Sequence, residues 1–255
     1  MARVKPVAHD ERLTVVDHLD ELRSRIVISL AAFGVIFAFC GWQNQRILEI
    51  VNRPLPDDFG QPITFGITEP FTTTFTNAAY AALLISLPVL LYQAYAFVLP
   101  AFSPTERRVA QPLMLMVPVL FILGVVFCYF VVLPPATDFL LSFNASEFNT
   151  QVRARDYYSF STLTMAAMGI GFQVPVGILA LVRLRIVSVE QLRRHRRYAF
   201  LGIAVLASLL PTIDPVTMLL EMVPLVILYE ISILFAARFG FAADEVADST
   251  ADESS

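Results

Sequence analysis

The sequence predicts an all-α polytopic membrane protein with six transmembrane helices, the last two of them short, and with both termini in the cytoplasm. Composition supports this fold class: hydrophobic residues make up 56% of the 255 residues, charged residues only 16%, and the mean hydropathy is +0.66. These values are too apolar for a soluble domain of this length. The apolar residues also form runs long enough to cross a bilayer as helices, and polar segments separate the runs.

The chain divides into three predicted segments: a cytoplasmic N-terminal segment at 1–13, a six-helix membrane domain at 14–238, and an acidic tail at 239–255. The first segment has no apolar stretch followed by a cleavage site, so it is not expected to be a secretory signal peptide. The tail carries most of its charge as acidic side chains and few large apolar ones, and it is therefore predicted to be disordered and cytoplasmic.

The membrane domain is predicted to begin with an amphipathic helix. Val15, Leu19, Leu22 and Ile26 recur at helical spacing and form one apolar stripe, with charged residues on the other side. Such a helix lies at the membrane interface and leads directly into the first span. That span is predicted to end at Trp42, an interfacial aromatic anchor.

A polar, proline-bearing loop at 43–71 follows, and its length indicates a functional role. The second apolar segment, at 72–99, would be on the order of 40 Å long as a helix, which is longer than the hydrocarbon core is thick. It must therefore tilt, bend at Pro88 or project from the bilayer. It ends in a charged segment at 100–108, at the predicted membrane edge.

The remaining spans are predicted at 109–133, 157–182, 198–210 and 216–235. The third is expected to stop at Pro134 and Pro135, and the fourth to be interrupted between Gly169 and Pro175. The fifth would be only about 20 Å long, short of the roughly 30 Å hydrocarbon core. Either the bilayer thins there or this hairpin does not cross it fully.

The placement of basic residues predicts the orientation. With six spans, 14 of the 18 basic residues fall on the side that holds both termini, and four fall on the other side. The positive-inside rule therefore places both termini in the cytoplasm of a cell-membrane protein.

Two carboxylates, Glu21 and Glu106, stand on this predicted cytoplasmic side, each at the end of an apolar run. Carboxylates at a membrane edge can hold guanidinium groups by bidentate, charge-assisted hydrogen bonds. Ordinary ion pairs remain an alternative, because Glu21 stands four residues before Arg25 and Glu106 precedes two arginines.

Several short motifs follow one another in a fixed order: HLDELRSR at 18–25, PVLLYQAYAF at 88–97, Pro100, ERR at 106–108, YFVV at 129–132, GFQVP at 171–175, DP at 214–215 and YE at 229–230. In this order and spacing they resemble the TatC family, the signal-receptor subunit of the twin-arginine (Sec-independent) protein translocase. The resemblance covers about residues 12–238.

The resemblance implies a non-enzymatic receptor that binds the paired-arginine signal peptides of folded cargo proteins at the cytoplasmic face. It implies that Glu21 and Glu106 belong to the signal-binding site and that Arg23, Phe97 and Arg107 shape it. The chemistry of the residues agrees, because carboxylates are acceptor-only groups and arginine is donor-only.

The resemblance also implies single-span partner subunits of the TatA/TatB type, self-association in a larger complex, and export driven by an ion gradient. Gln173 is expected on the partner side, although a hydrogen bond within the chain is the open alternative. Met218 and Glu221 depart from the family pattern. Glu221 is hypothesised to compensate for the lost polar residue at 218 by contacting a partner helix or thinned bilayer, with ordinary burial as the alternative.

Pro54, Tyr129 and Asp214 are expected to have structural roles, with Pro54 and Asp214 in loops on the periplasmic side. The sequence shows no metal-ligand spacing, phosphate-binding glycine loop or nucleophile motif, so no metal, cofactor, nucleic-acid partner or catalytic residue is expected.

A second functional class, a proton-coupled secondary transporter of small solutes, stays open. It would require charged residues along a central pathway and an internal repeat, and only Gln173 and Glu221 fit the first requirement.

Overall fold

The computed structural model describes residues 15–98, 104–148, 150–183, 186–208 and 214–252, with the side chains of 15–17, 57, 98, 104–112 and 239–252 left undescribed. The predicted N-terminal segment at 1–13 and residues 99–103 of the charged segment therefore lie outside the described residues. The helices are α1 (Val15–Trp42), α2 (Asn44–Asn52), the 3-10 turn η1 (Asp57–Phe59), α3 (Glu69–Val98), α4 (Pro104–Phe127), the π-helical turn η3 (Cys128–Val132), α5 (Leu133–Ser142), α6 (Ala154–Gly171), α7 (Val174–Arg183), α8 (Val189–Arg194), α9 (Arg196–Ser208) and α10 (Pro215–Asp252).

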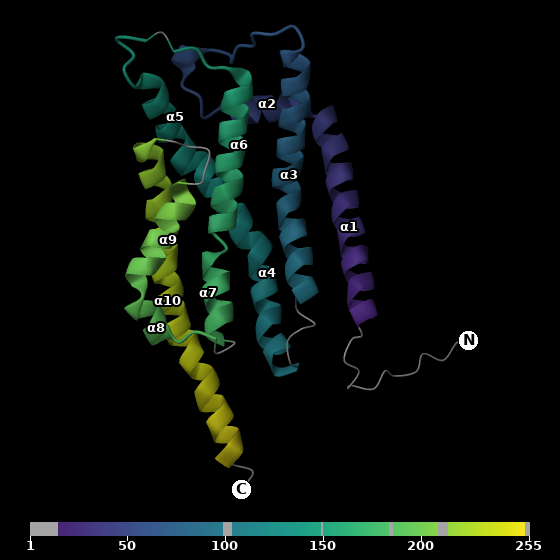
Figure 1. The fold of residues 1–255 in the computed structure, drawn as a ribbon, viewed down its shortest axis with the longest axis vertical. Helices are drawn as coiled ribbons and strands as arrows, with labels where there is room; N and C mark the ends of the chain where they lie inside the picture. The colour runs from purple at the N-terminus through teal and green to yellow at the C-terminus, as the bar shows by residue number, and fades with distance from the viewer. Residues whose placement is uncertain (1–14, 99–103, 149, 184–185, 209–213, 253–255) are drawn as a thin grey trace, which may run out of the picture.

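The long helices run side by side along the longest axis, and α2 lies across one end of them (Figure 1). We call this end the α2 end; it also holds the first turns of α3 and α6. The opposite end, the α8 end, holds the first turns of α1 and α4, the last turns of α3 and α7, and α8 itself. The described start of α1 and the end of α10 both lie toward the α8 end (Figure 1).

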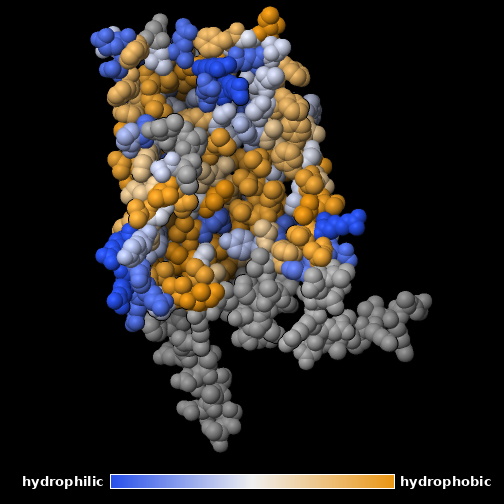
Figure 2. Space-filling model, in the orientation of Figure 1, coloured by the Kyte–Doolittle hydropathy of each residue, from blue (hydrophilic) through white to orange (hydrophobic). Residues whose placement is uncertain are grey.

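Five helical segments in the described part of the chain are long and apolar enough to cross a membrane: His18–Trp42, Glu69–Phe97, Leu113–Ser142, Ala154–Arg183 and Pro215–Arg238. They correspond to predicted spans one to four and six. The predicted fifth span is α9, which has only 13 residues, so its crossing stays a prediction. Exposed apolar side chains occupy the middle of the molecule, with hydrophilic ones gathered toward both ends (Figure 2).

One predicted boundary is wrong, and one predicted loop contains a helix. The third span does not stop at Pro134 and Pro135, because the π-helical turn η3 carries the helix into α5, where proline occupies an early position. The π-helical turn accommodates the prolines, because the hydrogen bond from the N–H of Leu133 to the carbonyl of Cys128 shifts the hydrogen-bond ladder directly before them. The predicted loop at 43–71 also contains the helix α2.

The C-terminal part of the chain differs from prediction as well. The last helix is not short, since α10 has 38 residues and continues to Asp252, into the segment predicted as a disordered tail. Six alanines between residues 236 and 251 favour this continuation, because alanine is the strongest helix former. The interruption of the fourth span is confirmed: α6 ends at Gly171 and α7 begins at Val174.

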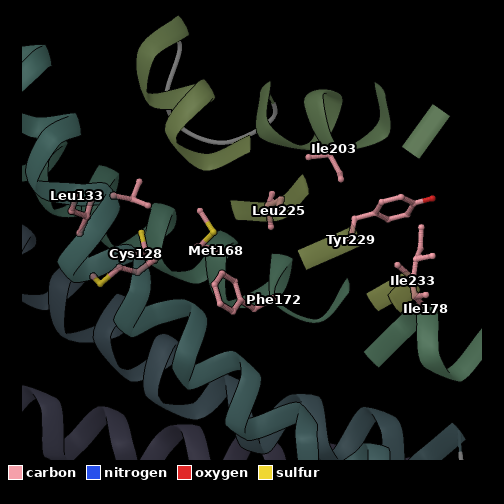
Figure 3. Packing of buried hydrophobic residues seen from close by; sticks show 11 residues of the cluster. Cys128, Leu133, Met168, Phe172, Ile178, Ile203, Leu225, Tyr229 and Ile233 are labelled. Atoms are coloured by element: carbon pink, nitrogen blue, oxygen red, sulfur yellow. The ribbon is translucent and has the colours of Figure 1, made fainter. Parts of the chain in front are cut away.

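The main core gathers the second half of the chain (Figure 3). Its buried residues come from η3, α5, α6, α7, α9 and α10 and the α6–α7 junction: Cys128, Val132, Leu133, Met165, Met168, Phe172, Ile178, Ile203, Leu225, Tyr229 and Ile233. A smaller cluster between α1 and α3 contains Cys40 and Ala82. The first helix therefore attaches to the bundle chiefly through α3.

Helices α4 and α6 cross at two glycines. A Cβ placed on Gly124 would lie 2.9 Å from the Cα of Gly169 and 2.9 Å from the carbonyl oxygen of Met168. A Cβ on Gly169 would lie 2.6 Å from the ring of Phe121. Glycine lets the two backbones approach this closely, as small residues do at helix interfaces within membranes.

Candidate functional site

At the α8 end, the first turns of α1 contact the last turns of α3. The imidazole ring of His18 stacks on the ring of Phe97, with 4.2 Å between the centroids and 13° between the planes. The two residues lie far apart in the sequence, so the register between α1 and α3 brings them together.

Glu21 lies one turn further along the same contact. Arg25 donates two hydrogen bonds to its Oε1, from Nη2 at 2.6 Å and from Nε at 3.0 Å. The Nη1 group of Arg25 reaches across to the Oε1 of Gln93 on α3, at 2.9 Å. The ion pair at i and i+4 that the sequence left open is therefore present, and it also links α1 to α3.

The second carboxylate oxygen of Glu21 is not used in this way. Its Oε2 lies 3.8 Å from the Nδ1 of His18, which is too long for a hydrogen bond. Within the described part of the chain, Oε2 accepts no hydrogen bond, and the side chain is 26% exposed. The arrangement thus leaves one half-buried acceptor oxygen available beside an aromatic pair.

The other predicted signal-binding residues have less defined positions. Arg23 is exposed on α1. Glu106 and Arg107 lie in the first turn of α4, which begins at Pro104, but their side chains lie outside the described residues. The structure therefore brings Glu21 and Phe97 to the same contact and places the first turn of α4, which holds Glu106 and Arg107, at the same end of the bundle.

The predicted partner-side residues lie largely inside the chain. Gln173 is buried at the α6–α7 junction, and its Nε2 donates to the carbonyl oxygens of Val117 on α4, at 3.1 Å, and Gly169, at 3.4 Å. The alternative of an internal hydrogen bond is thus realised for Gln173. Met218 is half-buried on α10.

Glu221 is completely buried, and its orientation differs from the hypothesised outward contact. Both of its carboxylate oxygens lack a hydrogen-bond partner among the described residues. The Oδ2 of Asp214 and the Oγ1 of Thr217, on the same helical face seven and four residues earlier, are also buried without partners. The start and the inner face of α10 therefore carry a short line of polar oxygens that have no hydrogen-bond partner among the described residues.

Asp214 also stands at the start of α10. Its Oδ1 accepts a hydrogen bond from the backbone N–H of Thr217 at 2.7 Å, and Pro215 is the first helical residue. Aspartate and proline together favour a helix start. The aspartate accepts a hydrogen bond from a backbone N–H of the first turn, and proline at the first helical position has no N–H that would need a partner.

Two carbonyls at the end of α2 and one just beyond it accept hydrogen bonds from three distant hydroxyl groups. Tyr129 donates to Ile50 at 2.7 Å, and Tyr157 donates to Val51 at 2.7 Å. Thr137 donates to the carbonyl of the buried Pro54 at 2.9 Å. The carbonyl of Val51 belongs to the last turn of α2, which leaves it without a partner inside the helix, whereas the carbonyl of Ile50 also accepts from the backbone N–H of Arg53. The three hydroxyl contacts tie the α2 end to η3, α5 and α6.

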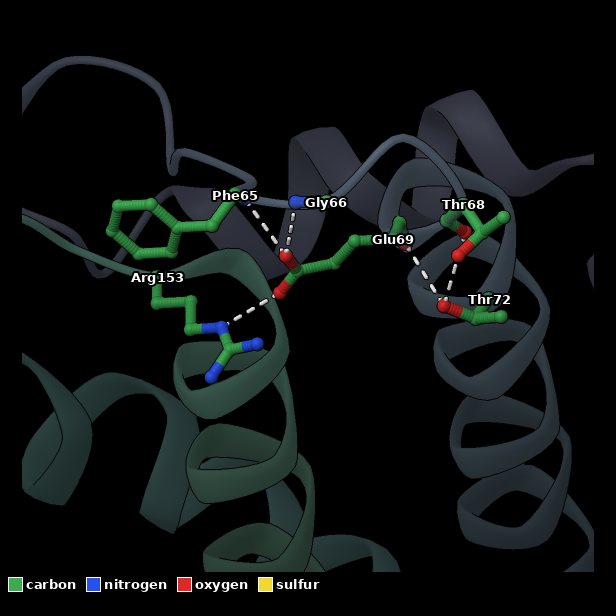
Figure 4. Close-up of polar contacts among 6 residues, drawn as sticks. All are labelled: Phe65, Gly66, Thr68, Glu69, Thr72 and Arg153. Atoms are coloured by element: carbon green, nitrogen blue, oxygen red, sulfur yellow. Dashed lines mark hydrogen bonds and ion pairs between the residues drawn. The ribbon is translucent and has the colours of Figure 1, made fainter.

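Glu69 and Arg153 form an ion pair at the α2 end that the sequence did not indicate (Figure 4). The Oε1 of Glu69 accepts from the Nε of Arg153 at 2.7 Å, and its Oε2 accepts from the backbone N–H groups of Phe65, at 2.7 Å, and Gly66, at 3.0 Å. The guanidinium also lies over the ring of Phe65. The carboxylate holds the pKa of Arg153 above its ordinary value by hydrogen bonding and attraction. The backbone of Ile63 also forms an isolated β-bridge with the backbone of Arg153.

We expect Glu69→Gln to lower the melting temperature of the purified protein more than Arg153→Gln does. An amide has one acceptor oxygen, so in Glu69→Gln either the two backbone donors or the guanidinium must face an NH2 group. In Arg153→Gln the carboxylate keeps both backbone hydrogen bonds. Glu49→Gln, at an exposed position on α2, is the control, and equal melting temperatures for all three variants would contradict the prediction.

Comparison with known proteins places this arrangement in a family. A family model described as Sec-independent protein translocase protein (TatC) matches residues 17–224. The chain belongs to the TatC family. It is therefore a multi-pass membrane protein of a protein-translocation system, and the resemblance seen in the motifs is confirmed.

Relatives within the TatC family match over nearly their whole length. The protein of Desulforapulum autotrophicum is 32% identical over 248 residues, which cover 96% of this chain and 92% of the relative. The Escherichia coli K12 protein is 34% identical over 225 residues, 87% of each chain. Both are named Sec-independent protein translocase protein TatC.

The fold also matches a solved TatC structure. A crystal structure of a protein named the twin-arginine translocase receptor TatC aligns with a TM-score of 0.74 and 33% identity, covering 86% of this chain and 98% of that chain. The all-helical architecture described above is therefore that of the family.

Proposed function

We propose that this TatC-family chain is the receptor subunit of a twin-arginine translocase in the cytoplasmic membrane. In this role it binds the paired-arginine signal peptides of folded proteins and assembles with single-span partner subunits for gradient-driven export. Its likeness to a solved protein that is named a twin-arginine translocase receptor supports the proposal. The excess of arginine at the α8 end supports the cytoplasmic placement of that end.

One observation carries the signal-binding part of the proposal: at the α1–α3 contact the half-buried Oε2 of Glu21 accepts no hydrogen bond from any described residue. An incoming guanidinium would find a charged acceptor there, and partial burial strengthens a charge-assisted hydrogen bond relative to water. The stacked rings of His18 and Phe97 add an apolar surface next to this acceptor. Glu106, at the start of α4, would supply a second carboxylate for the second arginine.

Binding of a fluorescent paired-arginine signal peptide to the full chain in nanodiscs tests this proposal. We expect Glu21→Gln and Glu106→Gln each to weaken binding by about tenfold, because each removes one charged acceptor. A paired-lysine peptide should bind wild type more weakly, since lysine lacks the bidentate fork.

Asp20→Asn is the matched control for this experiment. It removes one negative charge from the same turn of α1, at an exposed position beside Glu21, and should leave peptide affinity nearly unchanged. If Asp20→Asn and Glu21→Gln weaken binding equally, the peptide senses only overall charge. If Glu21→Gln and Glu106→Gln both bind as wild type does, these carboxylates do not form the signal site.

For assembly, we propose that partner helices contact the side of the bundle that holds Gln173, Met218 and Glu221. Membership of the TatC translocase family supports the existence of partners. Gln173 and Glu221 are buried in the chain alone, so their contact with a partner requires local separation of α10 from its neighbours. The line of polar oxygens on α10 would then gain hydrogen-bond partners that the described residues do not provide.

A further inference from the structure

The short helix α8 is held against the side of α10. Tyr229 of α10 donates a hydrogen bond to the carbonyl oxygen of Leu192 at 3.0 Å, and Val189 and Leu192 pack on the main core. Ser188 and Gln191 form a capping box that fixes the start of α8. The apolar side of α8 therefore faces the bundle, and its arginines face outward.

The contact between α8 and Tyr229 determines how far α8 lies from the end of the apolar segment of α10. Tyr229 stands nine residues before Arg238, the end of the apolar segment of α10, which corresponds to about 14 Å along the helix. The helix α8 thus lies beside the apolar part of α10 and not beyond its end. Arginines are costly in hydrocarbon, so we expect the arginines of α8 and of the first turn of α9 to reach from this depth toward the lipid headgroups, with the bilayer thinned beside the 13-residue α9.

The corner between α8 and α9 carries more positive than negative charge. Arg193, Arg194 and Arg197 are exposed, and none of them forms an ion pair within the described residues. Arg196 is the exception, because its Nη2 lies 2.9 Å from the Oε2 of Glu230. The hydrophilic patch at the lower left of Figure 2 lies where Figure 1 places this corner.

The first turn of α9 continues into an exposed apolar stripe. Leu201 and Val205 follow Arg197 at intervals of four residues, so the three share one face, and the two apolar side chains are 62% and 51% exposed. Tyr198 lies next to this face, with its ring under the guanidinium of Arg197. A ligand with an anionic head and an apolar tail matches this order of side chains.

We propose that the α8–α9 corner binds the phosphate of an anionic phospholipid, held by Arg193, Arg194 and Arg197, with an acyl chain along Leu201 and Val205. Arginine forks bind phosphate oxygens in a bidentate manner. The positive end of the α9 dipole points toward the same corner and favours an anion. Free phosphate would use the arginines alone, whereas a lipid uses the apolar stripe as well.

The test is native mass spectrometry of the full chain in detergent, titrated with phosphatidylglycerol or phosphatidylcholine. Wild type is expected to bind phosphatidylglycerol at least about tenfold more tightly, and R193Q/R194Q/R197Q is expected to lose this preference. The control R46Q/R53Q/R155Q removes three exposed arginines at the α2 end and should keep it. Equal loss in both triple variants, or retention in the first, would overturn the proposal.

Two further measurements use wild type alone, so they hold even if a variant does not fold. The preference for phosphatidylglycerol should weaken as salt rises from about 0.05 M to about 0.5 M, and a salt-independent preference would contradict an arginine site. Inorganic phosphate should not displace the bound lipid at matched concentration. If it does, the corner recognises free phosphate and the lipid assignment is wrong.

Discussion

Replacing Gly124 by leucine is expected to prevent formation of the native bundle, and Gly124→Ala is expected to destabilise it by about 1–3 kcal/mol. Even a methyl group on Gly124 would lie 2.9 Å from two backbone atoms of α6, which cannot rotate away as a side chain can. Helices α4 and α6 would have to separate. Thermal and denaturant unfolding of the purified protein in detergent would measure the change.

Gly177→Ala is the matched control for this prediction. Gly177 also lies inside a helix, but a Cβ there would meet nothing within 4 Å. Alanine has the higher helix propensity, so this variant should be unchanged or more stable by up to about 1 kcal/mol. If Gly124→Ala were as stable as Gly177→Ala, the close crossing of α4 and α6 would be wrong.

The second large effect is expected at Glu221, where replacement by leucine should raise the free energy of unfolding by roughly 1–3 kcal/mol. The carboxyl group is completely buried and has no hydrogen-bond partner in the described part of the chain, whereas leucine has a similar volume and no polar atoms to satisfy. Equilibrium unfolding would measure this gain. A loss of stability would show that the carboxyl has a favourable contact.

The Glu221→Leu variant also tests whether Glu221 takes part in assembly with partner subunits, independently of its effect on stability. If Glu221 serves a partner helix, the more stable Glu221→Leu protein should fail to co-purify with the partner subunits and should lose export. Glu230→Gln provides a comparison, because Glu230 is paired with Arg196 on the other side of α10. Normal assembly and export of Glu221→Leu would remove Glu221 from the proposed partner contact.

The sequence predicts the spans well where a long apolar run stands between polar segments, as it does for α1, α3 and α6 with α7. It fails at Pro134, because proline is normally read as a helix end and nothing in the local pattern announces a π-helical turn. It fails again beyond residue 238, where charge indicates disorder but helix propensity prevails.

The candidate site was predictable only in its local part. The spacing of Glu21 and Arg25 indicates their ion pair, but the stacking of His18 on Phe97 depends on the register between α1 and α3. The pair of Glu69 with Arg153 spans 84 residues of sequence and has no local signal beyond an acidic residue at a helix start.

Burial of Glu221 was unpredictable for a different reason. A helix that is apolar on every side gives no periodic signal, so the sequence cannot tell which face of α10 points inward. The family pattern marks Glu221 as unusual but not as buried.

The composition of the main core has a consequence for how the chain is made. Its residues extend from Cys128 to Ile233, so the core cannot close until the last helix has left the ribosome. Until then the surfaces of η3, α6 and α7 that face α10 stay uncovered, although α4 and α6 can already pack on each other at Gly124 and Gly169. The arrival of α10 therefore completes the main core, and every earlier stage of synthesis leaves part of it exposed.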